Sequence, residues 1–266
     1  MRVVLFVNLY SRKNNYKHFL LRKKLPTFVQ QKNDVMNDYL YKESDNLSAL
    51  VAIHPDLLLT LSHFNIPLGF GDKSIGEVCR THGINPQFFL LICQIYSNDS
   101  YLPTQATIMS TPMSGLVPYL IRSHDYYLNH RLPHIGHHLE KIASMLPDRA
   151  GKAIVRFFNA YLDEVRQHFI HEEKTVYPYI NQLLNHEHGN KFTITEFLDS
   201  HGNLEEKLSD LVQIIFKYLP HEASDDDAID MIFDILQLSR DLRKHSLVED
   251  KILGPYVKQL EKTALR

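Results

Sequence analysis

The sequence is short of cysteines, of long apolar runs and of net charge, and each shortage excludes a class of protein. Its two cysteines, Cys79 and Cys93, lie 14 residues apart, which matches no zinc-binding or redox motif and indicates no disulfide framework. No apolar run approaches the ~18 residues that cross a membrane, and VVLFV near the start is too short for the apolar core of a signal peptide. We therefore expect a protein of the reducing cytoplasm with no membrane contact.

The small net charge of −2 hides an uneven distribution. Residues 1–35 contain eight Lys or Arg and one Asp, a net +7, so the remainder of the chain carries −9. A basic arm of this kind can touch nucleic acid or anionic lipid. The simpler interpretation is a disordered extension over residues 1–38, or an upstream start codon with Met36 as the natural beginning. The acidic remainder argues against a nucleic-acid partner for the folded part.

Strand patterns are also missing, whereas helical periodicity is strong beyond residue 115. Titratable and apolar side chains recur at steps of three and four residues, so they share one face of a helix. Short connections should place successive helices side by side and antiparallel. We expect an all-α fold with an up-down-up-down four-helix bundle over residues 116–262. Its predicted helical segments are 116–146, 149–186, 193–219 and 226–262.

A smaller helical domain is predicted over residues 40–97. Pro55 separates two short helices, and Gly83 closes a third. Asn85 and Pro86 should start a fourth, as its cap and its first residue. Residues 98–115 are polar and contain prolines, which is typical of a linker between this domain and the bundle.

Histidine is the one residue in excess. The chain has 16 histidines, and 12 of them lie between positions 124 and 245. The stretch HFIHEEKTVYPYI, residues 168–180, recurs as HSLVEDKILGPYV, residues 245–257, at an offset of 77. The same offset relates His124 to His201, and each of these histidines lies 44 residues before its copy of the stretch. Repetition at equal spacing is typical of two copies of one structural unit.

The repeated histidines and glutamates should meet in one layer of the bundle. Each histidine lies about 21 to 23 residues from the turn near 147 or near 222, so at ~1.5 Å per residue all reach the same level. Each glutamate lies four residues past a histidine and therefore points the same way. The six residues of this layer are His124, His168, Glu172, His201, His245 and Glu249.

Metal ions would stabilise such a layer, because they attract the buried carboxylates. A buried unpaired carboxylate is unfavourable by several kcal/mol, and two carboxylates repel each other. Six protein ligands are too many for one tetrahedral zinc with an open position. They suit two octahedral ions bridged by the carboxylates, with room for an oxo or hydroxo bridge. Imidazole with carboxylate favours iron, and manganese or zinc less. Glu173 lies ~100° further round the helix, so we expect it to face solvent.

These residues resemble the ligand pattern of the hemerythrin-like di-iron bundle. The two His…HxxxE sets over 116–262 look like its bacterial branch of repair-of-iron-centres proteins, implicated in restoring iron–sulfur clusters after nitric oxide or oxidant damage. The resemblance implies two irons, each with two histidines, bridged by Glu172 and Glu249. FNIPLGFGDKSIGEVCRTHGI also resembles that branch's N-terminal domain, over about 45–96, but Gly69-Phe70 stand where those proteins show adjacent cysteines.

Two classes of function are consistent with these residues. In the first, the protein serves the nitrosative or oxidative stress response, by repairing damaged iron–sulfur proteins or by handling nitric oxide. In the second, it binds or senses O2 or nitric oxide without turnover, and the N-terminal domain docks a partner or forms a homodimer. A ferritin-like oxidase is a weaker third class, because those sites are carboxylate-rich. The residues alone leave open whether the protein is an enzyme.

Overall fold

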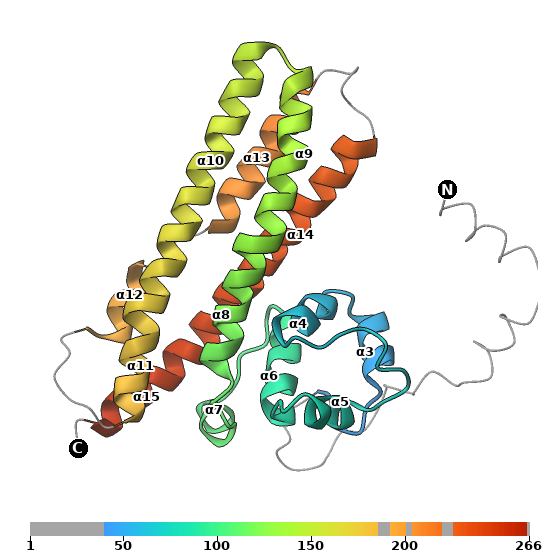
Figure 1. Cartoon of the computed structure of the whole chain (residues 1–266). Coiled ribbons are helices and arrows are strands. Elements are labelled where there is room, and N and C mark those ends of the chain that lie inside the picture. The colour runs from blue at the N-terminus through green and yellow to red at the C-terminus, as the bar shows by residue number, and fades with distance from the viewer. Residues whose placement is uncertain (1–39, 186–191, 201–203, 220–225, 265–266) are drawn as a thin grey trace, which may run out of the picture. The chain divides into compact units, whose positions relative to one another are not determined.

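The computed structural model describes residues 40–185, 192–200, 204–219 and 226–264, and the predicted extension over 1–38 lies outside these ranges. Within these ranges the chain forms helices and no strand, which confirms the all-α prediction. Figure 1 shows the long helices forming the rods of a bundle, and their outer ends lie within two residues of the predicted bounds. In chain order the rods are α8 (Leu116–Tyr126), η1 (Tyr127–Arg131) and α9 (Leu132–Met145); α10 (Asp148–His171), η2 (Glu172–Val176) and α11 (Tyr177–Leu184); α12 (Ile194–Ser200) and α13 (Leu204–Tyr218); and α14 (Asp226–Val248), η4 (Glu249–Leu253) and α15 (Gly254–Ala264). The third predicted helical segment is described as two helices, α12 and α13, on either side of residues 201–203.

A small helical unit precedes the bundle, and its caps follow from the sequence. The side chain of Asn85 accepts a hydrogen bond from the Phe88 N–H, and Pro86 is the first helical residue of the last helix. Gly83 has a φ of +67°, a left-handed conformation that suits glycine just after a helix. The helices of this unit are α3 (Leu47–Ile53), α4 (Leu57–His63), α5 (Ile75–Thr81) and α6 (Pro86–Ser97).

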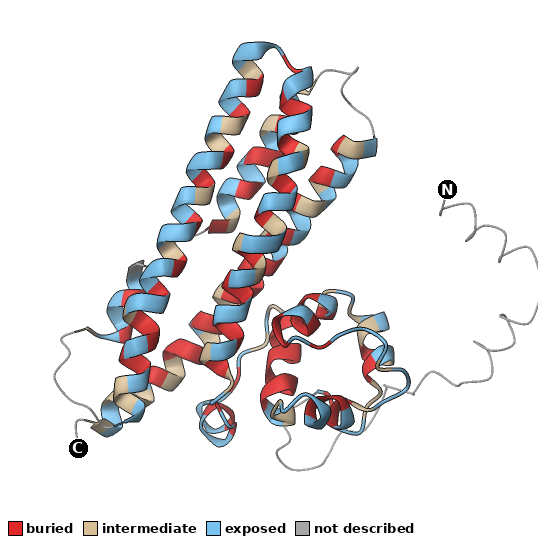
Figure 2. Cartoon of the chain, in the orientation of Figure 1, coloured by how far each residue is buried: buried red, intermediate tan, exposed pale blue. Residues whose placement is uncertain are grey.

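The segment expected to be a linker, residues 98–115, is itself packed. It contains a short helix, α7 (Gln105–Ser110), and Ile108 and Met113 are buried. Figure 2 shows buried residues running from the small unit into the adjoining half of the bundle. One apolar core includes Phe88 of α6, Tyr119 of α8 and Val257 of α15. The small unit and this half of the bundle therefore share a core rather than being joined by an open tether.

Three rods of the bundle contain a π-helical turn that ends two residues before a proline. Each turn ends with a backbone N–H bonded to the carbonyl five residues earlier, as from Tyr177 to Glu172 and from Gly254 to Glu249. Proline has no N–H to donate and its ring clashes with the carbonyl of an ordinary α-turn, so the shifted hydrogen bonds accommodate it. The prolines that follow the turns are Pro133, Pro178 and Pro255.

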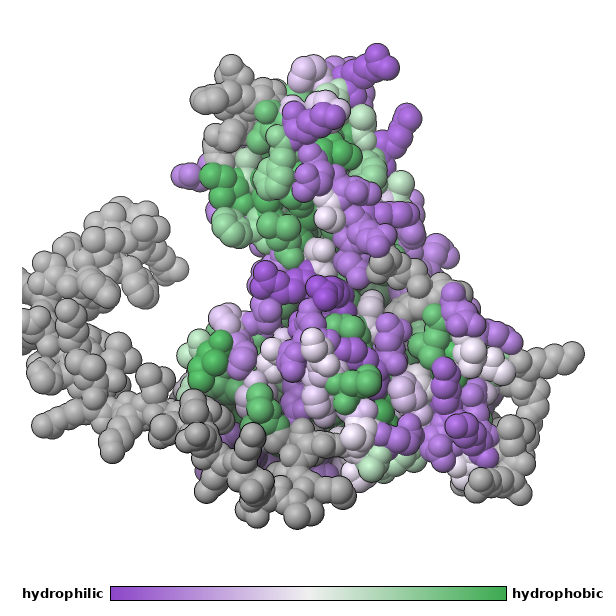
Figure 3. Space-filling model, turned by 180° about the vertical axis from the view of Figure 1, so that it is seen from behind, coloured by the Kyte–Doolittle hydropathy of each residue, from purple (hydrophilic) through white to green (hydrophobic). Residues whose placement is uncertain are grey.

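One face of the bundle exposes apolar side chains. Figure 3 shows them gathered over the upper part of the bundle seen from behind, where α13 and α14 lie. Within the described ranges, no helix is long and apolar enough to cross a membrane. The large exposed apolar residues of the two helices are Phe216, Tyr218, Ile229, Phe233 and Leu236.

Candidate metal centre

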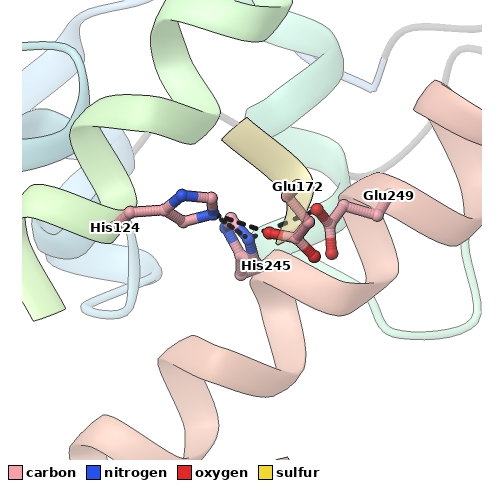
Figure 4. A group of neighbouring side chains, drawn as sticks. All are labelled: His124, Glu172, His245 and Glu249. Atoms are coloured by element: carbon pink, nitrogen blue, oxygen red, sulfur yellow. Dashed lines mark hydrogen bonds and ion pairs between the residues drawn. The ribbon is translucent and has the colours of Figure 1, made fainter. Parts of the chain in front are cut away.

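Four of the predicted ligands converge in the middle of the bundle, between two apolar cores. His124 comes from α8 and His245 from α14, while Glu172 and Glu249 are the first residues of the π-turns η2 and η4. One donor atom from each lies within 4.8 Å of the others, and the side chains are only 0–2% exposed. Figure 4 shows the side chains pointing toward one another. The sequence therefore places a polar layer where an ordinary bundle continues its core.

The imidazole of His124 is the most crowded group of this layer. Its Nε2 lies 3.0 Å from Glu172 Oε2 and 3.2 Å from His245 Nε2. The His245 Nε2 atom in turn lies 3.5 Å from Glu249 Oε1. A single imidazole nitrogen makes one hydrogen bond, so the approach of several donor atoms to one point is the arrangement expected around an ion.

Glu172 faces two different histidines with its two oxygens. Oε2 meets His124, and Oε1 lies 2.8 Å from Nε2 of His168, which precedes Glu172 by one turn of α10. The two oxygens of one carboxylate are thus directed to two different imidazoles. His168 is 17% exposed and stands at the edge of the layer. The sixth predicted ligand, His201, lies outside the described residues.

Glu173 is exposed to solvent, as the sequence predicts, but it also makes a contact that the sequence did not predict. Although its side chain is 41% exposed, its Oε1 lies 2.9 Å from Nδ1 of His124. Glu173 points away from Glu172, as the helical angle requires, but toward the neighbouring helix α8 rather than into solvent alone. The informative signal was its position beside a ligand, because metal-binding histidines commonly donate their second N–H to a carboxylate. That hydrogen bond leaves Nε2 as the atom of His124 that faces the layer.

Aromatic rings enclose the same imidazole. Phe169 stacks on His124 with ring centroids 3.9 Å apart and an angle of 8°, a contact that the sequence did not predict. The hydroxyl of Tyr177 lies 3.3 Å from Nε2 of His124. Tyr127 packs edge-on against His245, with centroids 5.7 Å apart. These rings keep bulk water away and hold the imidazole planes in place.

The buried charges shift the pKa values of the layer in opposite directions. Burial disfavours the protonated form of His124, but hydrogen bonds to Glu172 and Glu173 outweigh it and raise the pKa of the imidazole. Burial and the charge of Glu249 would raise the pKa of Glu172, yet the hydrogen bonds from His124 and His168 hold it below its usual range. Burial, and then the carboxylates, raise the pKa of Tyr177 well above normal, so its phenol keeps its proton.

The residues present fit a metal ion by their chemistry. Imidazole nitrogens and carboxylate oxygens are the ligands that iron accepts, and two buried carboxylates next to each other are stable when a cation lies between them. His124 is already oriented by Glu173, which is the second-sphere arrangement of bound histidines. The candidate site therefore has both a donor set and the support that a metal centre needs.

Comparison with known proteins agrees with this site. No curated protein matches the sequence. A model of the hemerythrin HHE cation binding domain does match, over residues 122–257. That match spans just over half of the chain and contains each predicted ligand, from His124 to Glu249. The chain belongs to the hemerythrin HHE cation-binding family.

Proposed function

We propose that this protein holds two iron ions in the polar layer of its bundle. The observation that carries the proposal is the buried cluster of His124, Glu172, His245 and Glu249. The first ion would take His124 and His245, whose Nε2 atoms are neighbours. The second would take His168, which meets the other oxygen of Glu172, and His201, the repeat counterpart of His124 in the sequence. Glu172 and Glu249 would bridge.

Such a centre supplies a redox-active cation pair that can bind O2 or nitric oxide. The chain's own residues prepare the site for it. Glu173 holds the proton of His124 on Nδ1, and Phe169 fixes the plane of the ring. Tyr177 keeps its phenol proton, so its O–H is a hydrogen-bond donor 3.3 Å from a ligand atom. Because the four clustered side chains are 0–2% exposed, only a small ligand fits.

The function we propose is a role in nitrosative or oxidative stress, through repair of iron–sulfur centres or handling of nitric oxide. The repeated ligand pattern and the small helical unit, which resembles the N-terminal domain of iron-centre repair proteins, support this role. The closed site supports nitric oxide or an oxidant as the molecule handled, because a protein-bound cluster cannot reach ligands that are this deeply buried.

One observation favours the second class, binding or sensing of O2 or nitric oxide without turnover. Gly69-Phe70 replace the adjacent cysteines of the repair proteins, and Phe70 packs against the apolar core. The two cysteines of the chain, Cys79 and Cys93, are buried and free. The small unit therefore has no exposed thiol for an exchange reaction.

Metal analysis with an optical spectrum of the aerobically purified protein tests the centre. We expect about two irons per chain from two ligand sets, with oxo-bridge charge-transfer bands in the near ultraviolet. One tightly held zinc and a featureless spectrum would contradict the di-iron proposal.

Reactivation of a nitric-oxide-damaged iron–sulfur enzyme separates the two functions. If the protein is a repair factor, adding it should restore the enzyme faster than adding the Glu172→Ala variant, which lacks a ligand. If it is a sensor, both proteins should leave the enzyme equally inactive, while only the unaltered protein binds nitric oxide reversibly.

A further inference from the structure

A second cluster of buried polar side chains joins the small helical unit to the bundle. We call it the His63–Asp241 cluster; its members are His63 of α4, Tyr96 of α6, Tyr119 of α8 and Asp241 of α14. All of them are almost completely buried. Two members come from the small unit and two from the bundle, so the cluster exists only while the two parts are packed together.

Hydrogen bonds run through this cluster in one direction and end on Asp241. The Tyr119 hydroxyl donates to the Tyr96 hydroxyl at 3.2 Å, and Tyr96 donates to Asp241 Oδ1 at 2.9 Å. The imidazole of His63 lies between Tyr96 and Asp241. Its Nδ1 is 3.3 Å from the Tyr96 hydroxyl, and its Nε2 is 3.3 Å from Asp241 Oδ2. Burial and the Asp241 carboxylate raise the pKa of Tyr96 well above normal, which keeps it a donor.

The position of Asp241 connects this cluster to the metal centre. Asp241 lies four residues before His245 on α14, one helical turn away and on the same side. Its backbone carbonyl accepts a hydrogen bond of 3.4 Å from Tyr127. The ring of Tyr127 packs edge-on against both His63 and His245, with centroids 5.6 and 5.7 Å away.

The same contacts also reach the second helix that carries a ligand. Tyr127 follows His124 by three residues and Tyr119 precedes it by five, so the cluster, together with Tyr127 packed against it, contacts the rod on both sides of His124. Arg122, between them, donates from Nε to the His63 carbonyl at 2.7 Å. The two imidazoles whose Nε2 atoms lie 3.2 Å apart are therefore carried by two helices that one buried network holds in register.

We infer that Asp241 is a positioning residue of the metal centre, and that His63 and Tyr96 of the small unit hold it in place. The small unit is then a support of the centre and not only a docking module. This inference rests on the proposed metal centre. Residues that hydrogen-bond a metal ligand commonly change metal affinity by about 10- to 100-fold. Asp241 acts one step further out, through Tyr96, His63 and its own helix, so its effect should lie at or below the lower end of that range.

The experiment compares iron release from the full-length protein and three variants. Asp241→Asn removes the charge at constant shape, and Tyr96→Phe removes the hydroxyl that donates to Asp241. Tyr179→Phe is the matched control, because it deletes a buried hydroxyl that bonds Glu261 at 2.8 Å, away from the cluster. Each protein is loaded with iron, checked by circular dichroism, and mixed with a chelator well below its unfolding temperature. The optical spectrum of the loaded protein with azide is recorded as a second readout.

We expect both cluster variants to release iron faster than the unaltered protein, by up to about tenfold, and to shift the azide band, while Tyr179→Phe does neither. Equal release rates and equal spectra in all four proteins would overturn the inference and leave the metal centre standing. If the unaltered protein itself holds no iron, the proposed function fails instead. Should Asp241→Asn not fold, Tyr96→Phe decides alone.

Discussion

The two buried polar clusters lie one helical turn apart on α14, yet they satisfy their charges in different ways. In the His63–Asp241 cluster, one carboxylate meets a tyrosine hydroxyl at 2.9 Å and an imidazole at 3.3 Å. In the metal centre, the two buried carboxylates Glu172 and Glu249 meet imidazoles whose nitrogens also crowd each other. The first set combines one carboxylate with an imidazole and two tyrosine hydroxyls; the second brings two carboxylates together with two imidazoles.

The difference shows what makes a buried polar cluster a metal site. Burial and titratable groups are present in both, so neither is diagnostic. A single carboxylate surrounded by hydroxyl donors is a stable protein interior. Two carboxylates at one point repel each other, and a cation held between them by imidazoles such as His124, whose orientation frees one nitrogen, would turn that repulsion into attraction.

Removing one of the two buried glutamates is the most direct test of whether this layer is a metal site. We expect Glu172→Ala and Glu249→Ala each to lose most of one of the two proposed metal equivalents, because each removes a carboxylate that would bind the ions. Metal content per chain after gel filtration is the measurement. Glu164→Ala is the control, since Glu164 lies on the same helix as His168 and pairs with Lys207 at the surface. Equal metal loss in the control would show that the layer is misassigned.

Glu173 allows a finer test, because it contacts His124 and is also reached by solvent. Glu173→Gln keeps a hydrogen-bond acceptor for His124 Nδ1 but removes its charge. We expect metal affinity to fall by about 10- to 100-fold, with two equivalents still bound at saturating metal. Competition with a coloured chelator measures this. If the metal affinity of Glu173→Gln equals that of the unaltered protein, Glu173 is only a surface residue.

Much of this arrangement could be predicted from the sequence, and the failures have physical causes. The bundle, its helix bounds and the convergence of Glu172 and Glu249 follow from periodicity and an offset of 77. The roles of Glu173 and Phe169 do not, because they depend on which neighbouring helix a side chain meets, and helical spacing describes only its own helix.

The His63–Asp241 cluster could not be predicted from the sequence, for a related reason. Its hydrogen bonds join residues 145 positions apart, as between Tyr96 and Asp241, and no repeat or motif marks them. The segment 98–115 shows the same limit: its polar, proline-containing composition is typical of a linker, yet tertiary packing buries Ile108 and Met113.

A third prediction concerns the sign of a stability change in metal-free protein. Glu249→Gln should stabilise it, on the order of 1 kcal/mol, because the substitution removes repulsion with Glu172. Asp241→Asn should destabilise it by about 1–3 kcal/mol, because His63 loses its buried partner. Urea unfolding after exhaustive chelation measures both. The same sign for the two substitutions would mean that the clusters do not differ as we describe.

We expect the smallest effect at the two cysteines, which are buried as free thiols. Burial raises the pKa of the Cys79 thiol to about 12 and that of Cys93 well above normal, so both stay neutral without a partner ion. Since the thiolate is the reactive form, iodoacetamide at pH 8 should leave the native protein unmodified and label both residues in denaturant, as mass spectrometry would show. Rapid labelling of one cysteine in the native protein would reveal an accessible thiol in the small unit. That result would remove the observation that favours binding without turnover, and would strengthen repair as the function.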